Sequence, residues 1–287
     1  MTNSANECWL VDLGLIGYEP ACELQRRAVE ARKADAIPDV LLLCEHPHVI
    51  TLGRNGRLEN LRASDSVLRQ KRVEFHPSDR GGDITYHGPG QIVGYPILDL
   101  ASHRRDVRWY VDRLEETMIR ATREFGIEAK RIEGLHGIWV DALAATEKID
   151  ALAATEKIDA LAATEKIDAL AAPEKLAAPA APEKLAALGV HLSRWVTSHG
   201  FAYNVSTDLR YFDLIVPCGI SEKRATSLEK LLGCDVNSSE VAERLARHFG
   251  EVFGRDLTPM SRDEFEAILL DRSDEAMPLH QQTAGMR

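Results

Sequence analysis

Short runs of apolar residues, several of them rich in β-branched side chains, predict most of the strands in this chain. These runs predict strands at 7–14, 39–53, 137–141, 185–195 and 199–205. The run at 39–53 carries a turn around Pro47, and two further strand pieces at 83–100 flank a His-Gly-Pro-Gly turn. Buried strands linked by tight turns are therefore expected through most of the chain.

Helical periodicity predicts four helices between and after these strands. The clearest is 107–127, where Tyr110, Leu114, Met118, Ala121 and Phe125 share one apolar face and Gly126 ends the helix. The others are predicted at 20–35, 237–254 and 261–272. The helix at 237–254 begins at a polar cap, either Asn237 or Ser238. Strands and helices that follow one another without regular alternation indicate an α+β fold, a mixed sheet flanked by helices.

One stretch has a different character. From Asp141 the sequence DALAATEKI occurs three times in tandem, and a proline-containing variant follows it. Nine residues turn an α-helix through about 900°, so successive leucines face opposite sides and form no common apolar stripe. Pro173, Pro179 and Pro182 interrupt any helix. We therefore expect one catalytic domain at 1–272, interrupted by a low-complexity insertion at 141–183, and a disordered tail at 273–287.

Composition and charge narrow the class of protein. The chain has 287 residues, 45% of them hydrophobic, and a formal net charge of −10, which does not favour a nucleic-acid partner. The five cysteines are scattered without a CxxC pair, and the N-terminus has no signal-peptide pattern. No apolar run reaches the length of a membrane span. We therefore expect a cytoplasmic protein that binds neither nucleic acid nor membrane.

The segment 80–91, RGGDITYHGPGQ, concentrates glycine beside an arginine, a tyrosine and a histidine. Glycines clustered in this way let the main chain approach another group closely. The segment lacks the Gly-Lys-Ser/Thr ending of a P-loop and is not a GxGxxG motif before a helix, so it does not favour a nucleotide-phosphate site.

Cys218, in DLIVPCGIS, is the candidate nucleophile. Taken alone, it is better interpreted as a small buried hydrophobic residue, which is the common state of a free cysteine. A reactive cysteine needs a neighbouring cation, because at an ordinary pKa of about 8.5 only ~3% is thiolate at pH 7. Lowering that pKa by ~1.5 units requires ~2 kcal/mol, which one nearby ammonium can supply.

Histidines offer a competing interpretation. Cys44, His46 and His48 alternate along one predicted strand and could form part of a metal site. A fourth ligand is missing from the pattern, and Pro47 disturbs the geometry, so a metal site is not favoured. His87, His136 and His199 each adjoin a glycine and, alone, are more typical of turns or cores.

Four motifs together resemble the lipoyl(octanoyl) transferase family. They are RGGDITYHGPGQ, GIWV, KLAALGVHLSRWVTSHGFAYNV and DLRYFDLIVPCGI, and the resemblance extends from Cys8 to about Leu232 apart from the insertion. The family's fold is the one shared by biotin and lipoate ligases. In this resemblance Cys218 matches the acyl-thioester nucleophile and Lys184 matches the lysine that lowers the cysteine pKa.

The resemblance also implies three substrate-binding segments. The first is Arg80, Gly81, Gly82, Asp83, Ile84, Thr85, Tyr86 and His87; the second is Ala187, Leu188 and Gly189; the third is Gly200, Phe201 and Ala202. The insertion supplies four further lysines in similar settings, of which Lys175 is the most similar to Lys184. Only Lys184 is followed directly by the Leu-Gly strand, so only Lys184 is expected to enter the site.

The implied activity is acyl transfer in lipoate biosynthesis. An octanoyl group would pass from octanoyl-acyl carrier protein to Cys218 and then to a lysine of an acceptor protein. The implied acceptors are the lipoyl domains of 2-oxoacid dehydrogenases and the glycine cleavage H protein. This chemistry needs no cofactor, no metal and no ATP, and backbone N–H groups of the glycine-rich segments would stabilise the oxyanion.

Two other functions remain compatible with parts of the sequence. An ATP-dependent lipoate or biotin ligase would share the fold but would need an adenylate site and no nucleophilic cysteine. A non-catalytic acyl-protein binding module would keep the acyl slot without needing the Cys218–Lys184 pair. Weighing the intact protein after exposure to octanoyl-carrier protein without ATP separates these functions.

Overall fold

Two sheets and the helices around them make up the structure, a computed structural model that describes residues 6–141, 181–216 and 224–275. The large sheet has eight strands in the order β11-β1-β2-β6-β10-β9-β8-β7. Their bounds are β1 Glu7–Leu15, β2 Asp39–Glu45, β6 Gln91–Ile97, β7 Lys130–Ile132, β8 Leu135–Val140, β9 Glu183–Ser193, β10 Val196–Asn204 and β11 Asp256–Met260. β1 runs parallel to β2 and β11, and the other pairs are antiparallel, so the predicted mixed sheet is confirmed.

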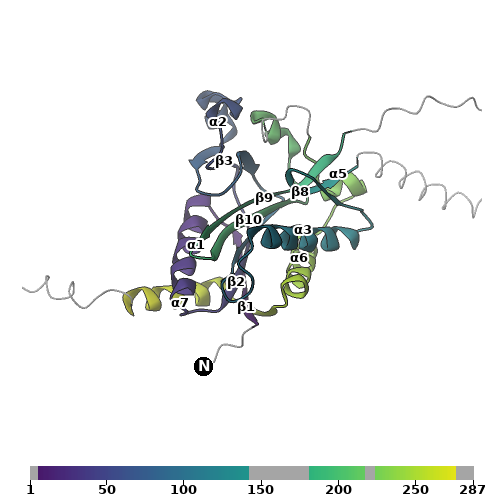
Figure 1. The fold of residues 1–287 in the computed structure, drawn as a ribbon. Helices are drawn as coiled ribbons and strands as arrows, with labels where there is room; N and C mark the ends of the chain where they lie inside the picture. The colour runs from purple at the N-terminus through teal and green to yellow at the C-terminus, as the bar shows by residue number, and fades with distance from the viewer. Residues whose placement is uncertain (1–5, 142–180, 217–223, 276–287) are drawn as a thin grey trace, which may run out of the picture.

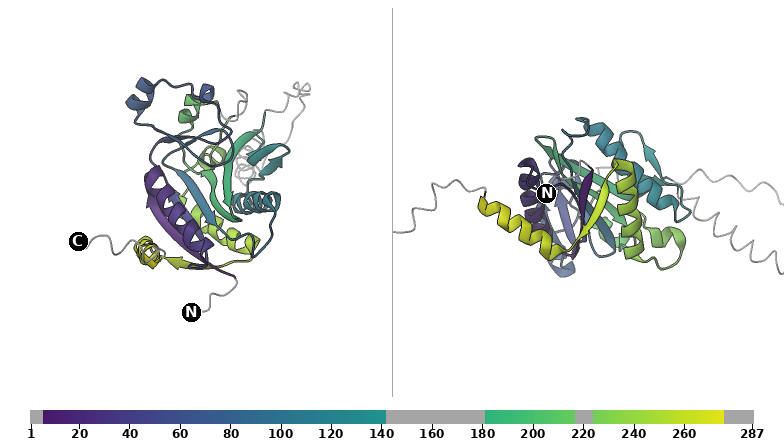
Figure 2. Two further views of the ribbon diagram at one scale, coloured as in Figure 1. Left: turned by 60° about the vertical axis from the view of Figure 1, so that its left-hand side comes forward. Right: turned by 90° about the horizontal axis from the view of Figure 1, so that it is seen from below.

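A smaller sheet lies beyond one end of the large one (Figure 1). It has the order β4-β3-β5, with β3 at Val49–Leu52, β4 at Glu74–Pro77 and β5 at Ile84–His87. Together with the 3₁₀ turn at Leu58–Asn60, the helix α2 at Asp65–Lys71 and the 3₁₀ turn at Leu209–Leu214, it forms a separate lobe (Figure 2). We call this region the small lobe.

Helices cover both faces of the large sheet. α1 (Tyr18–Lys33) and α7 (Arg262–Glu275) pack on one face, and α3 (Val107–Arg123) and α6 (Ser238–Phe253) pack on the other, with the short α5 (Leu228–Leu232) beside them (Figures 1 and 2). The strand β2 shows why both faces are covered. Leu41 and Leu43 point into the core under α3 and α6, whereas Val40, Leu42 and Cys44 point into the core under α1 and α7.

The predicted helices and strands correspond to these elements, but their bounds differ in several places. α3 ends at Arg123, three residues before Gly126, where the helix was expected to end. The run at 39–53 forms two strands in different sheets, because the chain leaves the large sheet after Glu45 and enters the small lobe at Val49. α1 begins at Tyr18, two residues before Pro20. α7 continues to Glu275, past Ser273, where the tail was expected to begin; residues 276–287 lie outside the described residues.

The predicted insertion falls at the join between β8 and β9. These two strands are antiparallel neighbours, and Val140 is the register partner of Glu183. Asp141 and Ala181, the described residues on either side of 142–180, therefore lie close to adjacent strand ends. Residues 142–180 of the predicted insertion at 141–183 lie outside the described residues, and the boundaries of the insertion stay a prediction.

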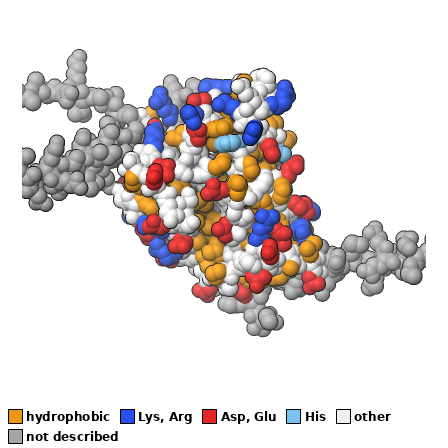
Figure 3. All heavy atoms as spheres, turned by 180° about the vertical axis from the view of Figure 1, so that it is seen from behind, with side chains coloured by type: hydrophobic (Ala, Val, Ile, Leu, Met, Phe, Trp, Pro, Cys, Tyr) orange, Lys and Arg blue, Asp and Glu red, His pale blue; other side chains and the backbone are white. Residues whose placement is uncertain are grey.

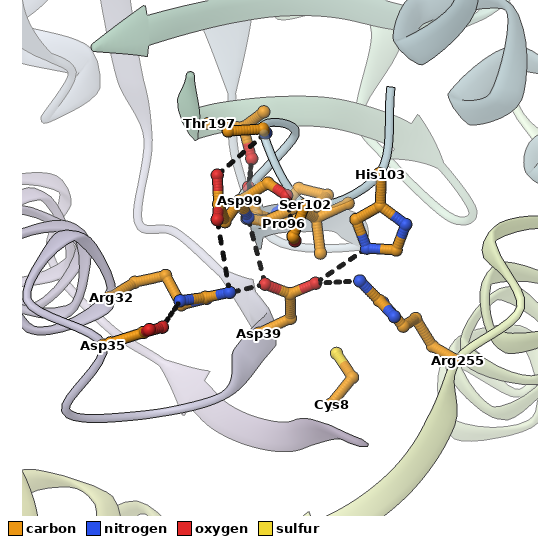
Figure 4. A network of polar contacts seen from close by, with 12 residues as sticks. Cys8, Arg32, Asp35, Asp39, Pro96, Asp99, Ser102, His103, Thr197 and Arg255 are labelled. Atoms are coloured by element: carbon orange, nitrogen blue, oxygen red, sulfur yellow. Dashed lines mark hydrogen bonds and ion pairs between the residues drawn. The ribbon is translucent and has the colours of Figure 1, made fainter. Parts of the chain in front are cut away.

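A buried ionic cluster joins β2 to helices and loops at the end of the sheet away from the small lobe. The Asp39 carboxylate accepts hydrogen bonds from Arg32 Nε at 2.9 Å and from Arg255 Nη2 at 2.6 Å (Figure 4). His103 Nε2 lies 3.4 Å from the same carboxylate, and the backbone N–H of Asp99 donates to it at 3.0 Å. Because Asp39 is only 2% exposed, its charge depends on these partners.

Replacing Asp39 with Asn should therefore destabilise the protein strongly. The substitution leaves two guanidinium groups without their shared counter-charge, a loss of roughly 3–5 kcal/mol. Urea denaturation followed by circular dichroism measures the change in the free energy of unfolding. The matched control is Glu23→Gln, which removes an ion pair to Arg26 whose two side chains are mostly exposed and should cost at most about 1 kcal/mol. Equal losses for the two variants would contradict this account of the cluster.

Candidate active site

Arg80 holds the small lobe against the large sheet. Its guanidinium is buried and donates to Thr51 on β3, from Nε to Oγ1 at 3.1 Å and from Nη2 to the carbonyl oxygen at 2.7 Å. The next residue, Gly81, donates its N–H to Val190 O on β9 at 2.9 Å. Two adjacent residues thus connect β3 of the small sheet with β9 of the large sheet.

Glycines make the close approach between these segments possible. A Cβ atom at Gly53 would lie 2.5 Å from Gly82 O, and one at Gly189 would lie 2.9 Å from Gly81 O. Both distances are shorter than Cβ contacts in proteins. The glycine-rich segment at 80–91 therefore packs main chain against main chain, as its composition predicts.

The space between the two sheets contains a cavity and a smaller slot that share part of their walls. The cavity has a volume of about 320 Å³ and the slot about 40 Å³. Both are lined by Arg80 and Thr85, by Ala187 and Leu188 of β9, and by Ala202 of β10. Small side chains on two neighbouring strands leave a channel that is mostly apolar, which suits a hydrocarbon chain.

The three predicted binding segments meet at these walls. The cavity is also lined by Gly82, Asp83 and Ile84, and the slot is also lined by His87, Gly189, Gly200 and Phe201. Two predicted residues lie elsewhere. Gly81 faces an adjoining groove, and Tyr86 is fully buried inside the small lobe, where its ring stacks on Tyr211 and its hydroxyl bonds to His48 Nδ1 at 2.8 Å.

Lys184 lies in the wall of the cavity, near the start of β9. Its Nζ atom is 4.6 Å from the centre of the Trp139 ring, a cation–π contact that favours the ammonium form. Trp139 is its register partner on β8, and the register shifts by one residue between Trp139 and Ile138. This bulge aims the Lys184 side chain at the cavity, because an extra residue in one strand changes the direction of its neighbours.

The backbone of Lys184 is joined to the segment that follows the predicted nucleophile. Its N–H donates to Arg224 O at 2.8 Å, and its carbonyl accepts from Thr226 N at 2.9 Å. On the other side of that segment, Val216 N donates to Asn60 O at 2.7 Å. Cys218 itself lies outside the described residues, so its predicted place in the site stays a prediction.

A chain of hydrogen bonds runs behind the cavity from the small sheet to this same segment. His87 Nδ1 and Gln91 Oε1 lie 2.7 Å apart, Gln91 Nε2 donates to Asn204 Oδ1 at 2.9 Å, and Asn204 Nδ2 donates to Thr226 O at 2.9 Å. All four residues are at least nine-tenths buried. Burial lowers the pKa of His87 to about 3, so its ring is neutral at physiological pH.

The histidines of the alternative metal site serve as hydrogen-bonding groups in the structure. His46 is buried and bonds to Ile16 O and to the Tyr95 hydroxyl, each at 2.7 Å, and its Nε2 lies 3.6 Å from Cys44 Sγ. His48 points instead into the small lobe, where it stacks on Tyr211. Within the described residues, no group of three or more His, Cys, Asp and Glu side chains has the arrangement of a metal site.

His199 closes one end of the slot in an unusual backbone conformation. Its φ angle is +54°, its N–H donates to Gln25 Oε1 of α1 at 2.9 Å, and its Nε2 lies 2.7 Å from Asp79 Oδ1. The hydrogen bond to His199 holds the pKa of Asp79 at about 2. Asp79 directly precedes Arg80, so this contact ties β10 to the segment that lines the slot.

Several residues that line the cavity have no role in the sequence-based prediction. They are Gln91, Leu135, His136, Trp139, Asn204, Phe212, Arg224 and Ala225. Trp139, Gln91 and Asn204 occur within the motifs GIWV, HGPGQ and FAYNV, but nothing in those motifs shows which side chains face the cavity. Alternation along β10 could have selected Asn204, because it shares a strand face with Ala202.

The fold and sequence both match one family. The model of the lipoyl protein ligase A/B catalytic domain matches residues 17–250. The chain is similar to the octanoyltransferase of Solibacter usitatus, with 46% identity over 88% of this chain and 96% of the relative. It is also similar to the octanoyltransferase of Caldicellulosiruptor saccharolyticus, with 39% identity over 92% and 95% of the two chains.

Among solved structures, the fold resembles a bipartite lipoate protein ligase from Thermoplasma acidophilum. The TM-score is 0.64 with 14% identity, over 94% of this chain and 93% of the ligase, so this likeness concerns the fold alone. The chain belongs to the lipoyl protein ligase A/B catalytic domain family. The relatives named octanoyltransferase also confirm the prediction of an acyltransferase. No helix among the described segments has both the length and the apolar composition needed to cross a membrane.

Replacing Asp79 with Ala should lower stability in a pH-dependent way. Because the pKa of Asp79 is depressed in the folded protein, the contribution of its bond to His199 is present above the ordinary aspartate pKa of about 3.9. That contribution is lost as the pH falls toward 2. Thermal unfolding of wild type and Asp79→Ala between pH 7 and pH 3 should show a difference in melting temperature that narrows with acidification.

The control for this measurement is Asp235→Ala. Asp235 is exposed and makes no ion pair within the described part of the chain, so its replacement should change the melting temperature little at any pH. An Asp79→Ala difference that stays constant from pH 7 to pH 3 would show that the His199 contact does not depend on the aspartate charge.

Proposed function

We propose that the protein transfers an octanoyl group from octanoyl-acyl carrier protein to a lysine of a lipoyl domain, through a thioester on Cys218. The acceptors are the lipoyl domains of 2-oxoacid dehydrogenases and the glycine cleavage H protein. The observation that carries the proposal is that Lys184 and residues of all three predicted binding segments line a cavity and a slot that share walls between the two sheets. The names of the relatives support the octanoyl group as the group transferred.

In the first half of the reaction the Cys218 thiolate attacks the carbonyl carbon of the octanoyl thioester. A carbon–sulfur bond forms, and the carbonyl electron pair moves to oxygen. The oxyanion then collapses and expels the carrier thiolate, which takes a proton from the Lys184 ammonium. The contact of Lys184 with the Trp139 ring supports this role, because it favours the protonated lysine that stabilises a thiolate nearby.

In the second half the ε-amine of the acceptor lysine attacks the acyl-enzyme. An amide bond forms, the Cys218 thiolate leaves, and the proton lost by the amine passes to neutral Lys184. The lysine thus ends in the state in which it began, and no nucleotide is consumed. The mostly apolar walls of the cavity and the slot support the role of the binding segments, because an octanoyl chain needs apolar lining along its length.

The charge of the small lobe supports an acidic carrier as the donor. The whole chain has a formal charge of −10, yet residues 54–72 carry six basic and two acidic side chains. The basic side chains are all exposed, and Lys and Arg residues gather over the small lobe (Figure 3): Arg54, Arg57, Arg62, Arg69, Lys71 and Arg72. A local positive surface beside the site would attract an anionic partner that the rest of the protein repels.

Mass spectrometry after exposure to octanoyl-carrier protein without ATP tests the proposal. We expect one octanoyl group on the peptide that contains Cys218, and its transfer to an added lipoyl domain. Cys218→Ser should take up no stable octanoyl group and should lose transferase activity by a factor of 10³ or more, on the order found when nucleophiles are removed. A strict requirement for ATP would favour the ligase alternative, and an unmodified wild-type protein that binds the carrier would favour the binding module.

The role of Lys184 is tested by the alkylation of Cys218 with iodoacetamide across a range of pH. Lys184→Ala should move the alkylation curve to higher pH by about one unit, because the thiolate loses its neighbouring cation. Lys184→Arg keeps the charge but cannot release a proton, so its curve should stay near that of wild type while acyl transfer falls. Lys175→Ala is the matched control and should change neither measurement. If Lys175→Ala shifts the curve and Lys184→Ala does not, the lysine is wrongly assigned.

A further inference from the structure

The chain of hydrogen bonds behind the cavity has a fixed direction. Gln91 Nε2 donates to Tyr86 O at 3.2 Å, and Asn204 Nδ2 donates to Thr226 O at 2.9 Å. A backbone carbonyl can only accept, so these two contacts determine which end of each side-chain amide is nitrogen. Gln91 Oε1 must then accept from His87 Nδ1, and Asn204 Oδ1 must accept from the second hydrogen of Gln91 Nε2.

Counting hydrogens leaves one donor of this hydrogen-bond network without an acceptor among the described residues. Both N–H bonds of Gln91 are used, one for Tyr86 O and one for Asn204 Oδ1. Asn204 Nδ2 uses one N–H for Thr226 O, and the second has no acceptor among the residues that the structure describes. Asn204 is only 4% exposed, and a buried donor without an acceptor costs about 1–3 kcal/mol.

The unused N–H belongs to a side chain in the wall of the cavity that also contains Lys184. The anchoring carbonyl of Asn204 belongs to Thr226, whose N–H donates to Lys184 O at 2.9 Å. One residue of the 224–226 segment therefore holds both the asparagine amide and the backbone of the lysine.

The neighbouring hydrogen bonds also strengthen this donor. In a chain of hydrogen bonds each bond polarises the next, and here every bond runs from the neutral His87 ring toward Asn204. The amide is held in place before any substrate enters, so no reorganisation accompanies the reaction. A fixed, neutral donor in a mostly apolar cavity has the properties of an oxyanion-stabilising group.

We infer that the Asn204 side-chain amide donates its unused N–H to the carbonyl oxygen of the acyl group and stabilises the oxyanion in both halves of the reaction. The inference rests on the proposed acyl transfer and adds a catalytic residue to it. Asn204 acts together with any backbone N–H donors of the glycine-rich segments. Gln91 and His87 are positioning residues in this arrangement, because they act on the substrate only through Asn204.

Two substitutions at Asn204 test the inference. Asn204→Ala removes the donor, and Asn204→Asp keeps the shape and the acceptor for Gln91 while replacing the N–H with an oxygen. Loss of one oxyanion donor lowers kcat about 10²–10³-fold. We expect losses of this size in both half-reactions, measured by rapid quenching with octanoyl-carrier protein and then with a lipoyl domain, at near-normal KM for the carrier.

Alkylation of Cys218 by iodoacetamide separates catalysis from a structural effect. That reaction passes through no oxyanion, so in Asn204→Ala its rate and pH profile should match those of wild type. In Asn204→Asp the added carboxylate raises the pKa of Cys218, so the limiting rate at high pH is compared and should match that of wild type. The matched control is Tyr203→Phe, which removes a buried hydroxyl bound to Thr122 from the opposite face of β10 and should leave acyl transfer unchanged. Thermal unfolding shows whether each variant is folded.

Three results would overturn the inference. Losses below about threefold in both Asn204 variants would show that the amide is not an oxyanion donor. Parallel losses of alkylation and transfer would show that Asn204 only supports the structure. A 10²-fold loss in Thr85→Val, with normal Asn204 variants, would give the role to the Thr85 hydroxyl in the same wall. If wild type itself takes up no octanoyl group, the proposed function fails first, and the inference about Asn204 fails with it.

Discussion

The contact between Arg80 and Thr51 is the interaction on which the site depends. The guanidinium is buried and would be costly there without its hydrogen bonds to β3 and to Gly81 O. Those bonds fix the Arg80 segment on β3, and the bond from Gly81 N–H to Val190 O joins that segment to β9. The space left between the two sheets is the cavity and its slot. The walls therefore come from two separately packed cores, and the width between them is set mainly by one arginine and the glycines around it.

Much of the fold follows from periodicity in the sequence, and the differences have local causes. The apolar face of 107–127 is the face that packs in the core, except that Phe125 lies after the end of α3 and is only partly buried. The hairpin between β9 and β10 turns at Arg194 and Trp195, both with positive φ and neither a glycine, so no turn signal marks it. The sequence also does not predict that 39–53 is divided between two sheets, because a continuous apolar run does not show which strands will pair with it.

The candidate site was predictable where main-chain chemistry determines it. The glycines of 80–91 predict close backbone contact, and the structure has it where Gly81 lies against Val190 O and Gly82 O lies against Gly53. Side-chain networks are a different matter, because Gln91 and Asn204 are 113 residues apart and only tertiary folding brings them together. The contact between Trp139 and Lys184 was not predictable either. It depends on a bulge in the pairing of β8 and β9, and no residue type in these strands indicates that bulge. The resemblance to a family supplied the functional residues, and the structure supplied the groups that orient them.

The pairing of Val140 with Glu183 also makes the connection between β8 and β9 a suitable insertion point for protein engineering. Two neighbouring strand ends can accept an added folded domain between them, because closing a longer loop costs only about 0.6 kcal/mol for each doubling of its length. A reporter domain inserted there would sit one residue from Lys184. The backbone bonds of Lys184 to Arg224 and Thr226 would shield the lysine from the motion of such a domain.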